Sequence, residues 1–273
     1  MNKTILILFI STFGFSAFGQ DKADSLFATG GQLYGKQDFL GAIKCFKEIA
    51  INYKAFKYYD QSIYNLAYAY NEVTDSLEQA IFWYEKIRGS KVKDNKKVGG
   101  RGIFEPYANY KHYSTFNIAN IEYHRGNYEK ALDYYRQCLT KFPYYNESGT
   151  DLRVNKNRLT IFIVDCLKEL KKYDEALATI IPEALDSYGS SNYNAVVNSA
   201  IILIEKNFDK KQVATELEAA FKTVKQSKNK YQFVFIWRNM TMDLFPYSAE
   251  SDITVESFVA EIKKADFWKQ LAN

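Results

Sequence analysis

The sequence predicts an all-α protein built from about four helical hairpins in series, followed by a C-terminal helical cap. Three observations support this prediction: a short motif recurs four times, helical spacing of apolar residues precedes each copy, and no alternating runs rich in Val, Ile and Thr indicate strands. The chain has 273 residues, of which 47% are hydrophobic and 25% charged. Such a composition is globular and excludes a wholly disordered chain.

The first nineteen residues have the pattern of a secretory signal peptide. Lys3 precedes an apolar run over residues 5–16, and Ala17 and Gly19 flank Phe18 at the expected cleavage site. The run is shorter than the roughly 20 residues that span a bilayer, so a membrane anchor is the less favoured alternative. We expect removal of residues 1–19 and no transmembrane segment in the mature chain, which would be periplasmic, outer-membrane-associated or secreted.

The recurring motif is a polar turn followed by a helix. The first turns of this helix contain an alanine that we expect to be buried. The four copies place Ala42, Ala80, Ala131 and Ala176 before an aliphatic residue. An aromatic residue follows four positions later in three copies, and the fourth has Ile180 there. Four residues make about one helical turn, so each pair shares a face. A second helical pattern with a small residue at mid-face, such as Gly30, lies upstream, which predicts closely packed helix pairs.

These pairs resemble the tetratricopeptide repeat and its L-G-x2-Y…A-x3-F…P signature. Residues 113–143 match best, because Pro143 follows Ala131 by twelve residues. The resemblance extends over residues 22–188, with hairpins at about 22–55, 58–88, 107–143 and 152–188, and implies a right-handed αα-superhelix. The family's Trp is missing from every copy. Successive alanines are 38, 51 and 45 residues apart rather than about 34, so insertions separate the repeats.

Residues 189–273 are predicted to form a degenerate repeat and a cap, because the terminal units of a solenoid need one wet face. The helices expected there cover residues 192–206, 210–226, 231–244 and 254–271.

No group of residues predicts catalysis, a cofactor or a metal. Gly30, Gly35 and Lys36 match part of a phosphate-binding loop, but they lie within a predicted helix and Gln37 replaces the required Ser or Thr. His112 and His124 would point about 120° apart around a helix. The net charge of +4 gives no bulk electrostatic reason to expect a nucleic-acid partner.

Three cysteines do not make a disulfide framework. Cys45, Cys138 and Cys166 lie within helical patterns and are expected to be small buried residues. A bridge between Cys138 and Cys166 stays an open alternative.

The resemblance implies that the first helix of each hairpin lines a partner-binding groove. Tyr64, Tyr68 and Asn71 are spaced by four and then three residues, as are Phe116, Asn120 and Tyr123, so each set forms one stripe. The alternative is that some of these aromatics pack against the neighbouring repeat. The complete predicted lining is Phe27, Tyr34, Tyr64, Asn65, Tyr68, Asn71, Phe116, Asn117, Asn120, Tyr123, Arg158 and Asp165.

The insertion at residues 88–106 holds six basic and two acidic residues. We expect a solvated spacer, with a docking loop as the alternative.

The function predicted from these features is a non-enzymatic module that binds a protein or peptide in a bacterial envelope or outside the cell. The alternative is capture of a carbohydrate or small ligand in an envelope uptake complex, with tyrosines stacking on sugars.

Overall fold

The computed structural model describes residues 4–98, 105–185, 193–228, 232–244 and 253–273, with side chains described from Gly19 onward. It divides into two compact units. Unit 1 is Met1–Gly102 with Pro106–Ile121, and unit 2 is Ile103–Glu105 with Glu122–Asn273. Each unit is described separately below. The predicted boundary at residue 188 lies outside the described residues.

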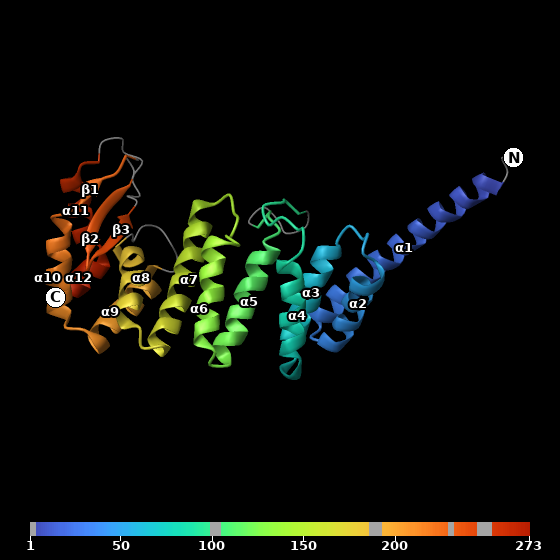
Figure 1. The fold of residues 1–273 in the computed structure, drawn as a ribbon, viewed down its shortest axis with the longest axis horizontal. Coiled ribbons are helices and arrows are strands. Elements are labelled where there is room, and N and C mark those ends of the chain that lie inside the picture. The colour runs from blue at the N-terminus through green and yellow to red at the C-terminus, as the bar shows by residue number, and fades with distance from the viewer. Residues whose placement is uncertain (1–3, 99–104, 186–192, 229–231, 245–252) are drawn as a thin grey trace. The chain divides into compact units, whose positions relative to one another are not determined.

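Helices in hairpins make up most of the described chain (Figure 1). Consecutive helices pack on each other, α1 on α2, α2 on α3 and α3 on α4 in unit 1, and α6 on α7, α7 on α8 and α8 on α9 in unit 2. The predicted class of helical hairpins in series is confirmed. The helices are α1 (Thr4–Gly35), α2 (Phe39–Asn52), α3 (Tyr59–Asn71), α4 (Leu77–Arg88), α5 (Tyr110–His124), α6 (Tyr128–Thr140), α7 (Gly149–Glu169), α8 (Tyr173–Leu185), α9 (Tyr193–Asn207), α10 (Lys210–Phe221), α11 (Val255–Lys264) and α12 (Asp266–Ala272).

Three hairpins share one turn geometry. The first helix ends at a left-handed residue, which is Gln37 with φ 63°, Gly126 with φ 78° or Lys171 with φ 57°. The N–H of the next residue then donates to the carbonyl five positions earlier, which is the long bond of a Schellman motif. These bonds join Asp38 to Leu33 at 2.9 Å, Asn127 to Glu122 at 2.9 Å and Lys172 to Leu167 at 2.8 Å.

The same turn sets the register of the second helix. The carbonyls of Asp38, Asn127 and Lys172 each accept the N–H of the motif alanine four residues later, at 3.0 Å in all three hairpins. The α3–α4 turn differs, because a short 3₁₀ helix, η1 (Thr74–Ser76), precedes α4. All four motif alanines are fully buried, which confirms the alignment of the repeats: Ala42, Ala80, Ala131 and Ala176.

The α1–α2 crossing requires a glycine. A Cβ atom at Gly30 would lie 2.9 Å from the ring of Phe46 and 3.2 Å from Cβ of Cys45. That separation is too short for two carbon atoms, which make contact at about 3.5–4.0 Å. Gly30 is therefore the small residue at the crossing, as the sequence predicts, and not part of a phosphate-binding loop.

The prediction of a helix at residues 231–244 is wrong. The described residues there form β2 (Phe233–Trp237) and β3 (Met240–Leu244), and β1 (Lys225–Gln226) pairs with β2, giving an antiparallel sheet in the order β1-β2-β3. Arg238 and Asn239 both have positive φ, as the two central residues of a type I′ hairpin turn do. The predicted helix at 254–271 is also divided, because α11 ends at Lys264 and α12 begins at Asp266.

The alternation of buried and less buried side chains along β2 explains why this segment forms a strand. Phe233, Phe235 and Trp237 are buried, whereas Val234 is half-buried and Ile236 is 57% exposed. The buried face packs on the C-terminal helices through Phe233, stacked on Phe258 with ring centroids 4.1 Å apart, and through Phe235, edge-on to Phe221 at 5.7 Å. Burial of one strand face outweighs any helical preference of this segment.

Arg238, in the β2–β3 turn, connects the sheet to two helices of unit 2. Its Nε donates to Glu216 of α10 at 2.7 Å and its NH1 to Asp174 of α8 at 2.8 Å. The guanidinium also lies 5.1 Å from the ring centroid of Phe208 and 5.0 Å from that of Trp237. Burial raises the pKa of Glu216, but the bonds from Arg238 and Gln212 outweigh burial and hold it below its usual value.

Among the described residues, no helix has both the length and the apolar content needed to cross a bilayer.

Candidate functional site

Three tyrosines of unit 1 form an aromatic cluster across the first helices of two hairpins. We call Tyr34, Tyr64 and Tyr68 the tyrosine cluster. The ring centroids of Tyr34 on α1 and Tyr68 on α3 are 5.6 Å apart, and Tyr64 and Tyr68 stack at 6.1 Å with an interplanar angle of 18°. Tyr64 and Tyr68 are one helical turn apart, so they lie on one face of α3. The structure thus brings together three residues of the predicted groove.

Neighbouring residues hold the cluster in place. Tyr64 lies 6.1 Å from Tyr84 and 5.4 Å from Tyr110 between ring centroids, and both of these neighbours are buried. The hydroxyl of Tyr34 donates to Glu72 Oε1 at 3.4 Å. Tyr68 is 37% exposed, so one ring of the cluster remains open to a partner.

The phenols of Tyr34 and of its neighbour Tyr84 are held uncharged at neutral pH. Burial raises the pKa of Tyr34, and Tyr68 and Glu72 raise it further. Burial and the adjacent Tyr64 likewise raise the pKa of Tyr84. The hydroxyl groups therefore act as neutral hydrogen-bonding groups beside a large apolar surface.

The other predicted groove residues of unit 1 divide into two groups. Asn65, Asn71 and Asn120 are half-buried on α3 and α5, on the first helices of their hairpins. Phe27 is also half-buried, but it belongs to a separate aromatic group, with centroid distances of 5.8 Å to Phe56 and 5.2 Å to Tyr58.

Two residues on α5 correct the predicted groove. Phe116 is only 9% exposed, so it packs in the interior and offers little surface to a partner. The side-chain amide of Asn117 donates to the hydroxyl of Tyr84 at 3.0 Å, so this nitrogen already serves contacts within unit 1. Both residues fit the alternative of packing between repeats.

The predicted groove residues of unit 2 are Tyr123, Arg158 and Asp165. Tyr123 lies edge-on to Tyr128 at 5.4 Å, and its pKa is raised by burial and by the carboxylates of Asp165 and Glu169. Asp165 accepts from Lys168 at 2.9 Å. Tyr123 and Asp165 are therefore neighbours, while Arg158 is half-buried two turns earlier on α7.

The basic insertion does not behave as a solvated spacer where it is described. Asp94 is 8% exposed, and its carboxylate accepts the N–H groups of Lys111 at 2.9 Å and His112 at 2.8 Å. These are among the first N–H groups of α5, which lack partners within the helix, so Asp94 caps α5 from seventeen residues away. Residues 99–104 of the insertion, including Gly100 and Gly102, lie outside the described chain.

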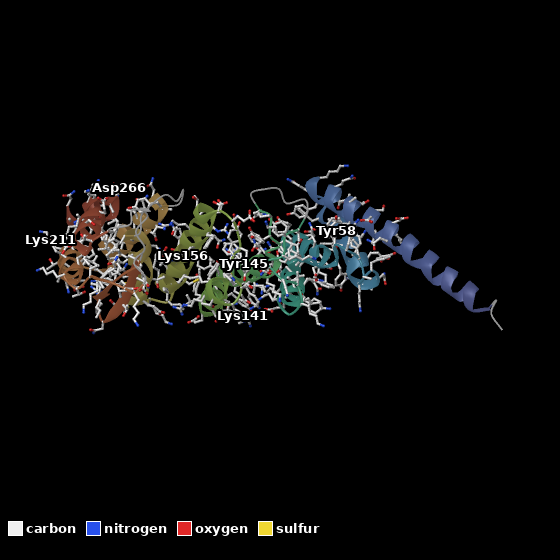
Figure 2. All side chains as sticks on the ribbon, turned by 90° about the horizontal axis from the view of Figure 1, so that it is seen from above. Tyr58, Lys141, Tyr145, Lys156, Lys211 and Asp266 are labelled. Atoms are coloured by element: carbon white, nitrogen blue, oxygen red, sulfur yellow. The ribbon has the colours of Figure 1, made fainter. Side chains whose placement is uncertain are left out.

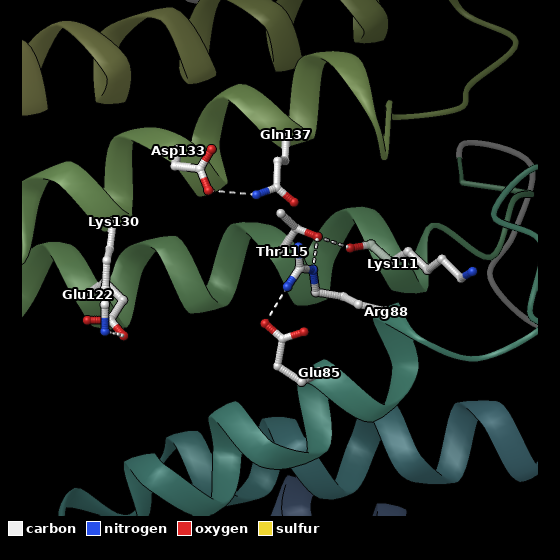
Figure 3. Close-up of polar contacts among 8 residues, drawn as sticks. All are labelled: Glu85, Arg88, Lys111, Thr115, Glu122, Lys130, Asp133 and Gln137. Carbon is white, nitrogen blue, oxygen red and sulfur yellow. Dashed lines mark hydrogen bonds and ion pairs between the residues drawn. The ribbon is translucent and has the colours of Figure 1, made fainter.

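Contacts between α4 and α5 hold the start of the insertion, at Arg88, in place. Figure 3 shows Arg88 of α4 reaching Thr115 of α5, where its Nε donates to the hydroxyl oxygen at 3.0 Å. Arg88 also pairs with Glu85, and the Thr115 hydroxyl donates to the carbonyl of Lys111 at 2.7 Å. The insertion therefore begins and ends on helices that are bonded to each other.

The cysteines are free thiols in this structure, so the alternative of a Cys138–Cys166 bridge is not realised here. Cys138 and Cys166 are buried, as expected, whereas Cys45 is half-buried. Burial raises the pKa of the Cys166 thiol to about 12, with a further contribution from Asp165. Within the described part of the chain, no three His, Cys, Asp or Glu side chains gather as a metal site would require.

Comparison with protein families gives a match for the third hairpin. Residues 113–145, which cover most of α5, the Gly126 turn and α6, match the family model of the tetratricopeptide repeat. Residues 113–145 therefore form a tetratricopeptide repeat. Its first and fourth hairpins repeat the turn bonds and the buried alanine of the matched hairpin, as described above.

The solved structures that the chain resembles include one with tetratricopeptide-like repeats. It is a crystal structure of the nearly identical TPR-like repeats of a Podosopora anserina protein named for a kinesin light chain. The sequences are 11% identical, the match covers 72% of this chain and 91% of the other, and the TM-score is 0.46. No curated protein matches the chain.

Tetratricopeptide repeats generally mediate contacts between proteins, and no catalytic family is indicated for this chain.

Proposed function

We propose that this chain is a non-enzymatic module that binds a protein or peptide, with Tyr68 and its neighbours as the binding surface in unit 1. The observation that supports the proposal is the tyrosine cluster, which presents a partly exposed ring on a framework of buried ones. Anchored aromatic residues of this kind dominate the binding energy of protein interfaces. Little side-chain entropy is lost on binding, because the neighbouring rings already hold the cluster.

Two asparagines extend this surface along α3. Asn71 follows Tyr68 by three residues and shares its face, and Asn65 is adjacent to Tyr64. An amide side chain both donates and accepts hydrogen bonds, which suits a peptide backbone.

We propose further that the chain is exported from a bacterial cell after cleavage at Gly19. The signal-like sequence supports this, and the named contacts of α1, those of Phe27, Gly30 and Tyr34, all follow the proposed cleavage point. The mature chain would keep the packed half of α1. Intact-mass measurement of envelope and culture fractions should find a chain that begins at Gln20, and a full-length cytoplasmic product would contradict export.

The binding surface is tested by site-specific photo-crosslinking. A benzophenone amino acid replaces Tyr68 in one variant and Phe82 in another. Phe82 is a matched control, because it is an exposed aromatic residue, 49% accessible, on the second helix of the same hairpin. We expect a defined protein adduct from position 68 and not from position 82.

Binding of the captured partner is then measured with point variants. Tyr68→Ala should weaken it by about tenfold or more, Tyr68→Phe should weaken it less, and Phe82→Ala should leave it unchanged. Equal effects at Tyr68 and Phe82, with unchanged thermal melts, would contradict the proposal. Glycan binding that is lost in Tyr68→Ala, with no protein adduct, would favour carbohydrate capture instead.

A further inference from the structure

The start of α3 and the basic insertion enclose a pocket of about 690 Å³ in unit 1. One wall is the beginning of α3, with Tyr58 and Asp60, and the other is the insertion from Lys91 to Val98. Tyr58, labelled in Figure 2, is 39% exposed. A pocket of this volume has the size of a small-molecule site.

The lining is strongly basic. The described lining residues carry a net charge of +4, because Asp60 opposes five lysines: Lys57, Lys91, Lys93, Lys96 and Lys97. Asp24, outside the lining, pairs with Lys57 at 3.0 Å, which leaves four lysines for a ligand. The whole chain also has a net charge of +4, so the charges of its remaining residues sum to zero. Like charges so close together repel one another, which opposes folding unless an anion relieves the repulsion.

The insertion holds these lysines in a fixed loop. Asp94, between Lys93 and Lys96, is bonded to the start of α5 as described above, and the N–H of Ala108 donates to the carbonyl of Lys96 at 2.9 Å. The N–H of Val98 donates to the carbonyl of Pro106 at 2.8 Å. A loop bonded at these points keeps its charges together in the absence of a ligand, so little ordering remains to oppose binding.

The chemistry of the lining points to phosphate. Among the described residues, no arginine lines the pocket, so these residues do not offer the planar two-bond recognition that favours carboxylates. Ammonium groups act as point charges with rotating donors, which suit the tetrahedral oxygens of phosphate. The N-terminus of α3, which has no side-chain cap, also borders the pocket through Tyr58 and Asp60, and a helix N-terminus adds partial positive charge.

Asp60 offsets part of the positive charge of the pocket. Burial raises the pKa of this carboxyl group, and the nearby Lys96 and Lys111 oppose that rise. One carboxyl group among the described lysines leaves the field of the pocket positive.

We propose that this pocket binds a compact anion carrying two or more phosphate groups, either free or on a lipid headgroup. The site is distinct from the tyrosine cluster and does not depend on the function proposed above.

Calorimetric titration of the full chain with inorganic tripolyphosphate tests the proposal. We expect saturable one-to-one binding that weakens between low and high salt, since the contacts are charged. Lys93→Gln with Lys96→Gln should weaken binding by about tenfold or more. The control is Lys44→Gln with Lys47→Gln, which removes two exposed lysines of α2 and should change affinity by less than about twofold.

Three results would overturn the proposal: no saturable binding up to about 10 mM, equal loss in both double variants, or hexaglutamate binding as tightly as tripolyphosphate. Circular dichroism checks that the variants keep the wild-type fold. Vesicles that contain cardiolipin, a lipid whose headgroup carries two phosphates, then separate the two sources. Capture that is lost in the Lys93 and Lys96 variant assigns the phosphate to a lipid, whereas no capture with retained tripolyphosphate binding assigns it to a soluble anion.

Discussion

The first and fourth hairpins share a turn but fill the helix crossing in opposite ways. Counting back twelve residues from the motif alanine gives Gly30 in the first hairpin and Val164 in the fourth, and counting forward four gives Phe46 and Ile180. All four residues are buried. The smallest residue thus meets a large aromatic ring in the first hairpin, and a larger aliphatic residue is matched with a smaller partner in the fourth.

The two hairpins therefore differ in how bulk is divided between these two positions, and the identity of neither residue is fixed. Protein interiors are packed to crystal-like density, so an added methyl group on one helix requires a smaller side chain on the other. The turn bonds and the alanine fix the register, and the crossing residues then adapt to each other.

The largest expected effect comes from moving the fourth hairpin's residue into the first. Gly30→Val would push side-chain carbons against the ring of Phe46 and should lower the free energy of unfolding by about 1–3 kcal/mol. Adding Phe46→Ile should recover part of the loss, with a coupling of about 0.5–3 kcal/mol in a double-mutant cycle. Denaturant unfolding measures both.

Gly31→Val is the control for this pair, because a Cβ atom at Gly31 meets nothing within 4 Å. It should be neutral or slightly stabilising, since Val has a higher helix propensity than Gly. Equal melting of the Gly30→Val variant and the wild type would show that the crossing is not tightly packed.

A substitution in the third hairpin tests whether the motif alanine tolerates a larger side chain. Ala131 is fully buried, so Ala131→Leu inserts bulk into a packed contact and should cost about 1–3 kcal/mol of unfolding free energy. Glu129→Leu, at an exposed position of the same helix, should cost far less. Thermal melts of the two variants provide the comparison, and indistinguishable melts would reject the proposed register.

A smaller effect is expected from exchanging the residues that begin the second helices. Asp38 accepts the N–H of Gly41 at 2.9 Å, whereas Lys172 at the matching position of the fourth hairpin has no carboxylate to offer. Asp38→Lys should lose about 1 kcal/mol of stability and Lys172→Asp should gain a similar amount. A gain for both variants, or a loss for both, would contradict the shared role of these positions.

The smallest effects concern the left-handed turn residue. Lys171 has φ 57° and Gly126 has φ 78°. Lys171→Gly should be stabilising by up to about 1 kcal/mol, and Gly126→Ala destabilising by about 1 kcal/mol, because a Cβ atom is strained in this region. Equilibrium unfolding of both variants checks the opposite signs, and a shared sign would mean that neighbouring side chains outweigh backbone strain.

The hairpins could be predicted because their signal is local and repeated. The alanine and the residue four positions later lie on one helical face, and the turn lies just before them, so sequence spacing alone locates each hairpin. The aromatic spacing of Tyr64 and Tyr68 likewise located part of the tyrosine cluster.

The β2–β3 hairpin had a sequence signal that adjacent apolar residues concealed. Phe233, Phe235 and Trp237 alternate, but Val234 and Ile236 between them are also apolar, so the segment reads equally well as a buried helix. Only the packing of the sheet on α10 and α11 decides between the two.

The basic pocket and the cap from Asp94 depend on contacts distant in sequence. No local pattern shows that Asp94 bonds to the start of α5 or that Lys57 lines the same pocket as Lys93. The bond of Asn117 to Tyr84 was hidden for the same reason, since it depends on the side chain that the preceding hairpin presents.

Arg238 has a consequence for the order in which unit 2 comes apart. The tip of a β-hairpin is normally an early place for a sheet to open, because its amides have few tertiary partners. Here the tip residue is bonded to Asp174 on α8 and Glu216 on α10. Opening the tip therefore requires breaking its bonds to both helices. In native-state hydrogen exchange, the amides of β2 and β3 should lose protection together with those of α10, as one cooperative folding unit.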